Sequence, residues 1–197
     1  MSSLFAKYVY LLDKYPLVTK GITGGVIASI SDLLCQILEQ SIVAFILLIE
    51  YITKQKKAID WVRNARFTGI NMLVISPLYH YYTAALLPRI LPVTTKMSLV
   101  RKLFVDQTLG ASFFTSVFFI GMSLFEGKSV QNGVDNLQNK FWYTLKNNWL
   151  LWPAANAINF SVIPLKFQVL YFNFVCIFWN IFLSYAQNVY KPAPKAA

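Results

Sequence analysis

The side chains most able to do chemistry are a few polar and ionisable residues that lie inside long apolar stretches. Six of them are candidate residues of a polar interior or a pore: Asp32, Gln36, His80, Asp106, Asn159 and Lys166. An ionised group in the middle of a bilayer must find a partner, lose its charge or meet water, so its presence points to a functional interior.

Small and polar residues recur on one face of each apolar stretch. On a helical wheel, Gly21, Gly25, Ser29, Asp32 and Gln36 fall within an arc of about 80°. The same holds for three further sets: Gly69, Ser76 and His80; Asp106, Gly110 and Gly121; and Asn159, Lys166, Asn173 and Asn180, which are seven residues apart. The glycines Gly21, Gly25, Gly69, Gly110 and Gly121 are expected to allow close helix packing.

These stripes have two interpretations. They line a water-filled path, or they are hydrogen-bonded contacts that hold the helices together. The second is the commoner role of Gly and Asn in membrane helices, whereas a pore needs several charges around one cavity. Asp32, Asp106 and Lys166 are the charged candidates for such a path.

The sequence contains no recognisable catalytic or metal-binding pattern. His80 is the sole histidine, and Cys35 and Cys176 lie inside apolar runs without CxxC spacing. Neither a P-loop nor a dinucleotide-binding fingerprint is present. We therefore expect a protein that is not an enzyme and that has no cofactor and no metal.

The amino-acid composition indicates whether the segments that carry these residues lie in water or in lipid. Of 197 residues, 56% are hydrophobic and 13% are charged, with a mean hydropathy of +0.49, whereas soluble domains carry about 25% charged residues. The prediction is an all-α integral membrane bundle, a single domain over residues 1–197. About four transmembrane helices are expected near residues 18–40, 66–87, 103–125 and 150–185.

Two segments fall outside this simple scheme. Val130, Val134, Leu137, Phe141 and Leu145 repeat every three or four residues, which predicts an amphipathic interfacial helix near 129–147. Residues 42–52 form an extra apolar segment that lies at the interface or packs on a neighbour.

The net charge of +10 comes from Lys and Arg residues that flank the apolar runs. This distribution favours anionic lipid headgroups and argues against nucleic acid as a partner. The candidate headgroup ligands, for a lipid such as cardiolipin, are Lys54, Lys56, Lys57 and Arg63. The basic residues are nearly balanced between the two sides, so the positive-inside rule gives no orientation.

Several short motifs stand out along the chain. The most distinctive is Asn148-Trp149-Leu150-Leu151-Trp152-Pro153, followed by Asn159-Phe160, Pro164, Trp179-Asn180 and Leu183-Ser184. Upstream are Tyr15-Pro16-Leu17, Thr19-Lys20, Asp32, Gln36, the run Asp60, Arg63 and Arg66, then Pro77-Leu78-Tyr79-His80, Thr94-Thr95-Lys96 and Asp106-Gln107. In order and spacing these motifs resemble one family, the small four-helix organellar proteins typified by Mpv-seventeen and the 22-kDa peroxisomal membrane protein.

The resemblance covers nearly the whole chain. It implies four spans in the mitochondrial inner membrane or the peroxisomal membrane and, for some members, a non-selective pore for small solutes. Departures from the family pattern are Ser76 in place of Gly, Ser112 in place of Pro, Asn156 in place of Gln, and Gln168 in place of a basic residue.

Our first functional hypothesis is an accessory, non-catalytic subunit of a large inner-membrane assembly of the respiratory chain or ATP synthase. It rests on the extra apolar segment, which needs a partner, and on the departures from the family motifs. The alternative is a channel-like pore for small solutes in the mitochondrial inner or peroxisomal membrane. A third hypothesis is a lipid-binding protein.

Overall fold

The computed structural model describes residues 3–46, 58–92, 95–163 and 168–191, and within these ranges the chain contains helices and no strand. The helices and the π-helical turns, labelled η, follow in the order α1 Ser3–Lys14, α2 Pro16–Ile46, α3 Trp61–Ile70, η1 Asn71–Ile75, α4 Ser76–Tyr81, η2 Tyr82–Leu86, α5 Leu87–Ile90, α6 Lys96–Val105, η3 Asp106–Gly110, α7 Ala111–Phe125, α8 Val130–Ser161 and α9 Gln168–Asn188.

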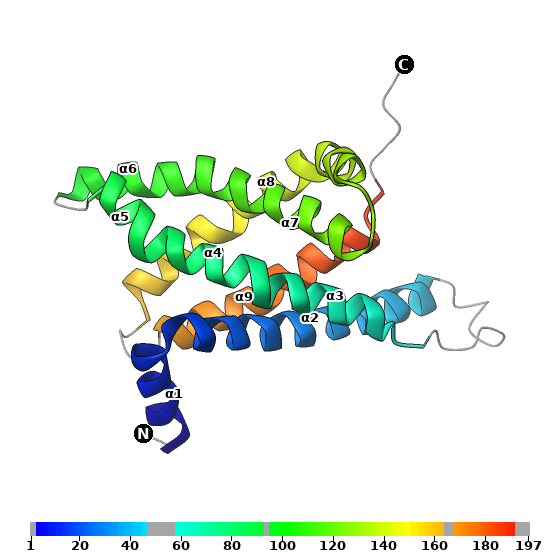
Figure 1. Cartoon of the computed structure of the whole chain (residues 1–197), viewed down its shortest axis with the longest axis horizontal. Coiled ribbons are helices and arrows are strands. Elements are labelled where there is room, and N and C mark those ends of the chain that lie inside the picture. Colours follow the sequence, from blue (N-terminus) through cyan, green and yellow to red (C-terminus); the bar gives the residue numbers. More distant parts are fainter. Residues whose placement is uncertain (1–2, 47–57, 93–94, 164–167, 192–197) are drawn as a thin grey trace.

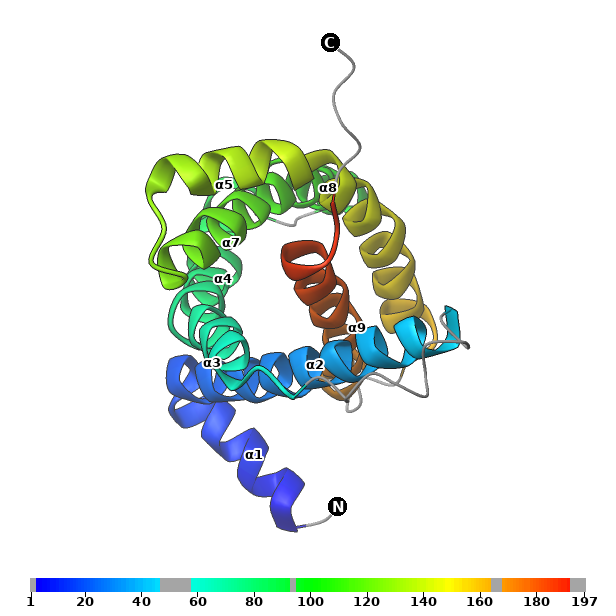
Figure 2. The ribbon, with the colours of Figure 1, turned by 90° about the vertical axis from the view of Figure 1, so that its right-hand side faces the viewer.

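Within the described residues, α3 to α5 form one continuous helical segment, and α6 to α7 form another. Together with α2, α8 and α9 they make five long helical segments, which we call courses. The courses α3 to α5 and α6 to α7 run roughly along the long axis of the molecule (Figure 1), whereas α2 and the start of α8 run partly across it (Figure 2). Viewed down that axis, α2, α3 to α5, α6 to α7 and α8 follow one another around a ring (Figure 2). Helix α9 lies between α2 and α8, and α1 projects outward from the start of α2.

The helices begin where the sequence supplies a starting residue. Pro16 is the first residue of α2, a position at which proline loses no helical hydrogen bond. Asp60 caps α3 by accepting from the Arg63 backbone N–H. Capping boxes open α6, from Thr95 and Ser98, and α8, from Ser129 and Asn132. These caps fix where each course enters the bundle.

The first two π-helical turns precede proline residues. Proline removes a backbone donor, and its ring collides with the carbonyl group four residues earlier. For Pro77 that carbonyl belongs to Leu73 in η1, and for Pro88 it belongs to Ala84 in η2. A wider turn at these positions relieves the collision and lets the helix continue. The turn η3 contains no proline, and we have no comparable account of it.

Helix α2 has an outer and an inner face. Val18, Ile22, Val26 and Ile30 are spaced four residues apart and are 46% to 61% exposed. The opposite face is buried, and it contains Gly21, Gly25, Ala28, Asp32 and Cys35. An apolar exterior around a more polar interior is the arrangement that lipid favours.

Within the described residues, two stretches are long and apolar enough to cross a membrane, Pro16–Gln40 and Val100–Phe125. They coincide with the spans expected near 18–40 and 103–125. The stretch expected as a span near 66–87 lies within the continuous course α3 to α5. Length and composition thus support a membrane protein.

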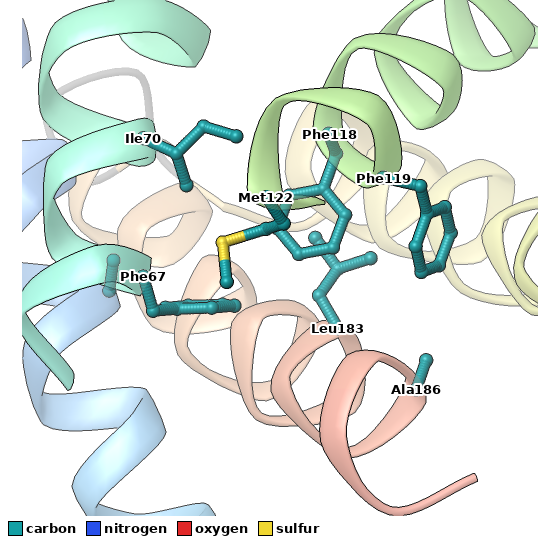
Figure 3. Packing of buried hydrophobic residues seen from close by; sticks show 8 residues of the cluster. Phe67, Ile70, Phe118, Phe119, Met122, Leu183 and Ala186 are labelled. Carbon is teal, nitrogen blue, oxygen red and sulfur yellow. The ribbon is translucent and has the colours of Figure 1, made fainter. Parts of the chain in front are cut away.

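The hydrophobic core lies where α3, α7 and α9 meet (Figure 3). Its buried members are Ala28, Phe67, Ile70, Phe118, Phe119, Met122, Leu183 and Ala186, and we call this set the core cluster. The rings of Phe67 and Phe118 meet edge to face with centroids 5.7 Å apart. Aromatic contacts of this geometry add to the stabilisation that burial gives.

The C-terminal third differs from the sequence expectation. The segment expected as a separate interfacial helix near 129–147 is the first half of the 32-residue helix α8. It packs on α7, with Gly133 facing the backbone of Ile120 and with Leu145 buried. Leu137 and Leu145 of its apolar stripe therefore meet protein, whereas Val130 is 58% exposed.

The stretch expected as one span near 150–185 is likewise divided between two helices. Helix α8 ends at Ser161 and α9 begins at Gln168, while Pro153 lies inside α8. Of the extra apolar segment 42–52, residues 47–52 lie outside the described residues.

Gln187 ties the end of α9 to the start of α8. It accepts a hydrogen bond from Asn136 at 2.9 Å and donates one to Glu126 at 2.9 Å. Its backbone carbonyl accepts from the buried Lys140 ammonium at 2.6 Å. Burial lowers the pKa of Lys140 to about 8, because water no longer solvates the charged form.

Candidate functional site

A cavity of about 570 Å³ lies inside the bundle, between α2, α4, α7, α8 and α9. We call it the central cavity. Its polar lining residues are mostly uncharged: Lys20, Thr23, Asn71, Ser76, His80, Thr83, Asp106, Gln107, Thr115, Asn148, Asn156, Asn159, Gln168, Asn173 and Asn180. Aromatic side chains supply much of the remaining wall, chiefly Tyr79, Phe114, Trp152, Phe172 and Trp179.

Each of the three π-helical turns contributes a polar residue to this lining. Asn71 comes from η1, Thr83 from η2, and Asp106 with Gln107 from η3. A π-helical turn shifts the register of the helix by about one residue, so it can redirect side chains that a regular helix would point elsewhere. Proline placement thus has a direct effect on the site.

One end of the central cavity reaches the surface beside the start of α2. Lys20 is exposed there, and its ammonium group lies 3.1 Å from Nδ1 of His80. The hydroxyl groups of Thr23 and Tyr8 lie 3.4 Å apart at the same end, where α1 meets α2. We call this end the mouth.

The other end is closed by apolar side chains. Phe118 and Leu183 both line the cavity and belong to the core cluster, where they are 2% and 7% exposed. Figure 3 shows them beside Phe67 and Met122. The cavity therefore ends at a hydrophobic seal in this conformation.

Several polar atoms of the lining have no hydrogen-bond partner among the described residues. They are Oδ1 of Asn148, Oδ1 of Asn159 and Oε1 of Gln107. Asn148 and Asn159 are 8% and 6% exposed. Unpaired buried acceptors are uncommon and destabilising unless water or a ligand reaches them. The lining is therefore built to meet a polar molecule.

A second polar region lies beyond the seal. Asp32 is fully buried, and its carboxylate accepts from Arg63 Nε at 2.9 Å, from Gln36 at 2.9 Å and from Asn64 at 3.2 Å. The hydroxyl group of Ser184 on α9 also donates to it. This carboxylate is therefore fully hydrogen-bonded.

Arg63 joins a second acid to this region. Its two terminal nitrogens donate to Glu39 at 2.7 and 3.1 Å, and one of them also donates to Ser184 at 2.9 Å. We call Asp32, Gln36, Glu39, Arg63, Asn64 and Ser184 the ionic cluster. It joins α2, α3 and α9 next to Leu183, so it reinforces the closed end.

The candidate polar-interior residues are thus divided between two places. His80, Asp106 and Asn159 line the central cavity, whereas Asp32 and Gln36 belong to the ionic cluster. Lys166 lies outside the described residues. The seven-residue series from Asn159 to Asn180 does not follow one helix, because α8 ends at Ser161, yet Asn159, Asn173 and Asn180 line the same cavity.

Arg63 does not fit its expected role as a lipid-headgroup ligand, because its side chain is only 13% exposed and is paired with two carboxylates. A guanidinium group that is already bound in this way cannot turn toward a phosphate without breaking the cluster. The other candidate headgroup ligands, Lys54, Lys56 and Lys57, lie outside the described residues.

The five glycines expected at helix contacts each face a neighbouring element. At Gly21 and Gly25, an added Cβ atom would lie 3.3 Å from the Met72 carbonyl oxygen and 3.0 Å from Met72 Cβ, respectively. At Gly69 it would lie 2.9 Å from the Phe125 ring. At Gly110 and Gly121 it would lie 2.6 Å from the Tyr82 hydroxyl and 2.6 Å from the Ile70 side chain, respectively. Gly24 was not expected, and there a Cβ atom would overlap the Ser76 hydroxyl.

Sequence reasoning missed several lining residues, among them Asn71, Gln107, Asn148 and Asn156. On α8, Asn148, Asn156 and Asn159 follow one another at intervals of eight and three residues, a helical spacing that could have revealed a shared face. In the part of the chain that the structure describes, no three His, Cys, Asp or Glu side chains are grouped closely enough to hold a metal ion.

Comparison with known proteins gives relatives along the whole chain. A profile of the Mpv17 / PMP22 family matches residues 123–184. Protein sym1 of Schizosaccharomyces pombe is 34% identical over 93% of this chain and 91% of its own length. Peroxisomal membrane protein 2 of Bos taurus is 29% identical over 91% of this chain and 87% of its own length.

Mitochondrial inner membrane protein Mpv17 of Caenorhabditis briggsae is 28% identical over 88% of this chain and 87% of its own length. No solved structure matches the chain at a significant level. The relatives nonetheless extend well beyond the matched profile, from the first helices to α9. With 34% identity to one of them over nine-tenths of both chains, the protein belongs to the Mpv17 / PMP22 family.

Proposed function

We propose that this chain is a non-enzymatic organellar membrane protein whose central cavity admits small polar solutes. One observation carries the proposal: an apolar bundle encloses a cavity of about 570 Å³ that is lined by amides and hydroxyls with unpaired polar atoms. Polar groups inside a membrane protein must be paired or hydrated. Such a cavity holds water, and it can exchange that water for a solute of similar polarity.

The two ends of the cavity give the proposal a mechanism. A solute enters at the mouth beside Lys20 and His80, and the seal formed by Phe118 and Leu183 blocks its exit. Hydrophobic constrictions of this kind stop conduction because they do not hold water. Passage would need the core cluster to separate, so the described conformation is the closed one.

The membrane arrangement belongs to the proposal as well. We infer four spans, two of which are Pro16–Gln40 and Val100–Phe125, with the others in the courses α3 to α5 and α9. The names of the relatives support a mitochondrial inner membrane or a peroxisomal membrane as the location. Membrane lipids are then the immediate partners of the exposed apolar side chains.

The hypothesis of an accessory subunit in a large inner-membrane assembly stays a prediction. The exposed apolar residues are those that lipid alone would require, so they do not favour a protein partner. Migration of the tagged protein on native gels of isolated organelles tests it. Recovery only in a very large assembly, with no solute passage by the purified chain, would favour the subunit and contradict our proposal.

Reconstitution tests the proposed function directly. Liposomes that contain the purified chain should take up small polar solutes faster than protein-free liposomes. Leu183→Ala should raise this rate, because it removes part of the seal without touching the mouth. Leu150→Ala on the outer face of α8, where the side chain is 77% exposed, serves as the matched control. Equal uptake with and without protein would refute the proposal.

A further inference from the structure

The side chains around the central cavity indicate which solutes it accepts. Carboxamides make up much of the polar lining, and three of them, from Gln107, Asn148 and Asn159, have an oxygen without a partner among the described residues. A carboxamide both donates and accepts hydrogen bonds. A hydroxyl group does the same, so several carboxamides around one space complement a molecule with several hydroxyl groups.

Aromatic rings alternate with these amides on two walls. On α8, Trp152 lies one turn after Asn148, and on α9, Phe172 and Trp179 are next to Asn173 and Asn180. The ring of Trp152 lies 5.2 Å from that of Phe172 and 6.2 Å from that of Trp179, measured between centroids. Flat apolar surfaces of this kind pack against the C–H face of a sugar ring while the amides bind its hydroxyls.

The charges around the cavity do not favour an ion of either sign. Lys20 contributes a positive charge at the exposed mouth, where its ammonium group contacts His80. Asp106 contributes a carboxylate, which accepts a hydrogen bond from Gln107 at 3.2 Å. Moving an ion away from water is expensive unless opposite charges surround it. Among the described lining residues, Lys20 and Asp106 contribute one charge of each sign, so neither an anion nor a cation meets a surplus of opposite charge, whereas the carboxamides suffice for a neutral solute.

The size of the cavity agrees with this chemistry. Its volume of about 570 Å³ lies within the usual range for ligand pockets, roughly 300 to 1,000 Å³. We propose that the central cavity selects uncharged polyhydroxylated molecules, such as hexoses and polyols, over ions of the same size. This inference rests on the proposed function and specifies the solute class of the same site.

Three solutes that differ mainly in charge test the selectivity. Glucose, gluconate and glucosamine are similar in size, and at about pH 6 gluconate is an anion and glucosamine a cation. Their entry into liposomes containing the full-length chain can be followed with radiolabelled compounds. Glucose should enter at least about tenfold faster than either ion, which corresponds to about 1.4 kcal/mol of discrimination. Equal entry of all three would overturn the selectivity and leave the proposed passage intact.

Entry of gluconate faster than that of glucose would indicate an anion-selective site, and faster entry of glucosamine would indicate a cation-selective site. Either result would overturn our inference. If none of the three enters, the proposed passage fails, and binding then decides the selectivity separately. Quenching of tryptophan fluorescence in detergent by glucose, but not by gluconate or glucosamine, would support the solute class. No quenching by glucose would overturn it.

Paired variants assign the effect to the cavity. Asn159→Asp keeps the shape of the side chain but adds a charge, so it should lower the ratio of glucose to glucosamine entry. Asn139→Asp, on the exposed face of the same helix, should not change that ratio. Trp152→Leu should weaken glucose quenching, whereas Trp142→Leu, at a position 61% exposed, should not. Identical behaviour of cavity and control variants would contradict the assignment.

Discussion

The ionic cluster and the central cavity contain the same kinds of side chain but use them differently. In the ionic cluster, the Asp32 carboxylate accepts from four donors, and Arg63 pairs with both Asp32 and Glu39. In the cavity, oxygens of Gln107, Asn148 and Asn159 are left without a partner among the described residues. The polar residues of one region hold helices together, while those of the other are free to bind.

This difference follows from where the partners lie. Around Asp32, the donors come from three helices that converge at the closed end of the bundle. Around the cavity, the amides line open space of about 570 Å³. Saturated hydrogen bonding therefore indicates a structural role, and unsaturated hydrogen bonding at similar burial indicates a binding role.

The largest effect is expected from Arg63→Met, which removes the positive charge beside the fully buried Asp32. An unpaired buried charge lowers the free energy of unfolding by about 3–5 kcal/mol. Unfolding of the detergent-solubilised protein measures the loss, and Asp32→Asn combined with Arg63→Met should recover part of it.

Lys128→Met is the control for this prediction. Lys128 pairs with Glu126 at 2.6 Å but is 56% exposed, and exposed pairs contribute less than about 1 kcal/mol. If both substitutions lowered stability equally, the ionic cluster would not be the structural region that we describe.

An intermediate effect is expected when one amide in each region is replaced by leucine. Gln36→Leu leaves the Asp60 backbone N–H and the Asp32 carboxylate each with one hydrogen bond fewer, a loss of about 1–3 kcal/mol. Asn148→Leu removes an oxygen that has no partner among the described residues, so stability should change by less than about 1 kcal/mol. If Gln36→Leu and Asn148→Leu lowered the free energy of unfolding equally in the same measurement, the ionic cluster and the central cavity would not differ as we describe.

The smallest effect concerns Lys140, a buried cation outside both regions. Its pKa of about 8 lies below the ordinary 10.5, so above about pH 8 the unfolded chain holds the proton more strongly than the folded chain. The wild type should therefore gain stability relative to Lys140→Met by about 1 kcal/mol between about pH 7.5 and about pH 9.

Melting temperatures of the two proteins across this pH range measure the gain. Lys146→Met, at an exposed position on the same helix, should show a constant difference from the wild type. A gain that does not depend on Lys140 would mean that this cation is better solvated than its burial suggests.

Local patterns were enough to predict the helices and the polar stripes. The stretch 18–40 was found from its apolar length, and its outer and inner faces follow the helical period. The effect of Pro77 on the backbone was also predictable, because proline always disturbs the preceding turn. The turn η3 was not, since α7, the helix that follows it, contains no proline.

The separation of structural from binding residues could not be predicted locally. Asp32 and Asp106 look alike in the sequence, because each is an isolated acid within an apolar helix. Asp32 is paired only because Arg63, 31 residues later, begins a helix beside it. Such long-range pairing depends on how the helices cross, and a helical wheel of one segment does not contain that information.

The hydrophobic seal has a consequence for the topology of the protein in its membrane. Because the cavity reaches the surface beside the start of α2, its contents can exchange with the compartment on that side while the seal is shut. The direction in which α2 is inserted then decides which organellar face supplies the bound molecule. In an Asn156→Cys variant, a membrane-impermeant thiol reagent added from that face would label the new cysteine, and the same reagent on the opposite face would not.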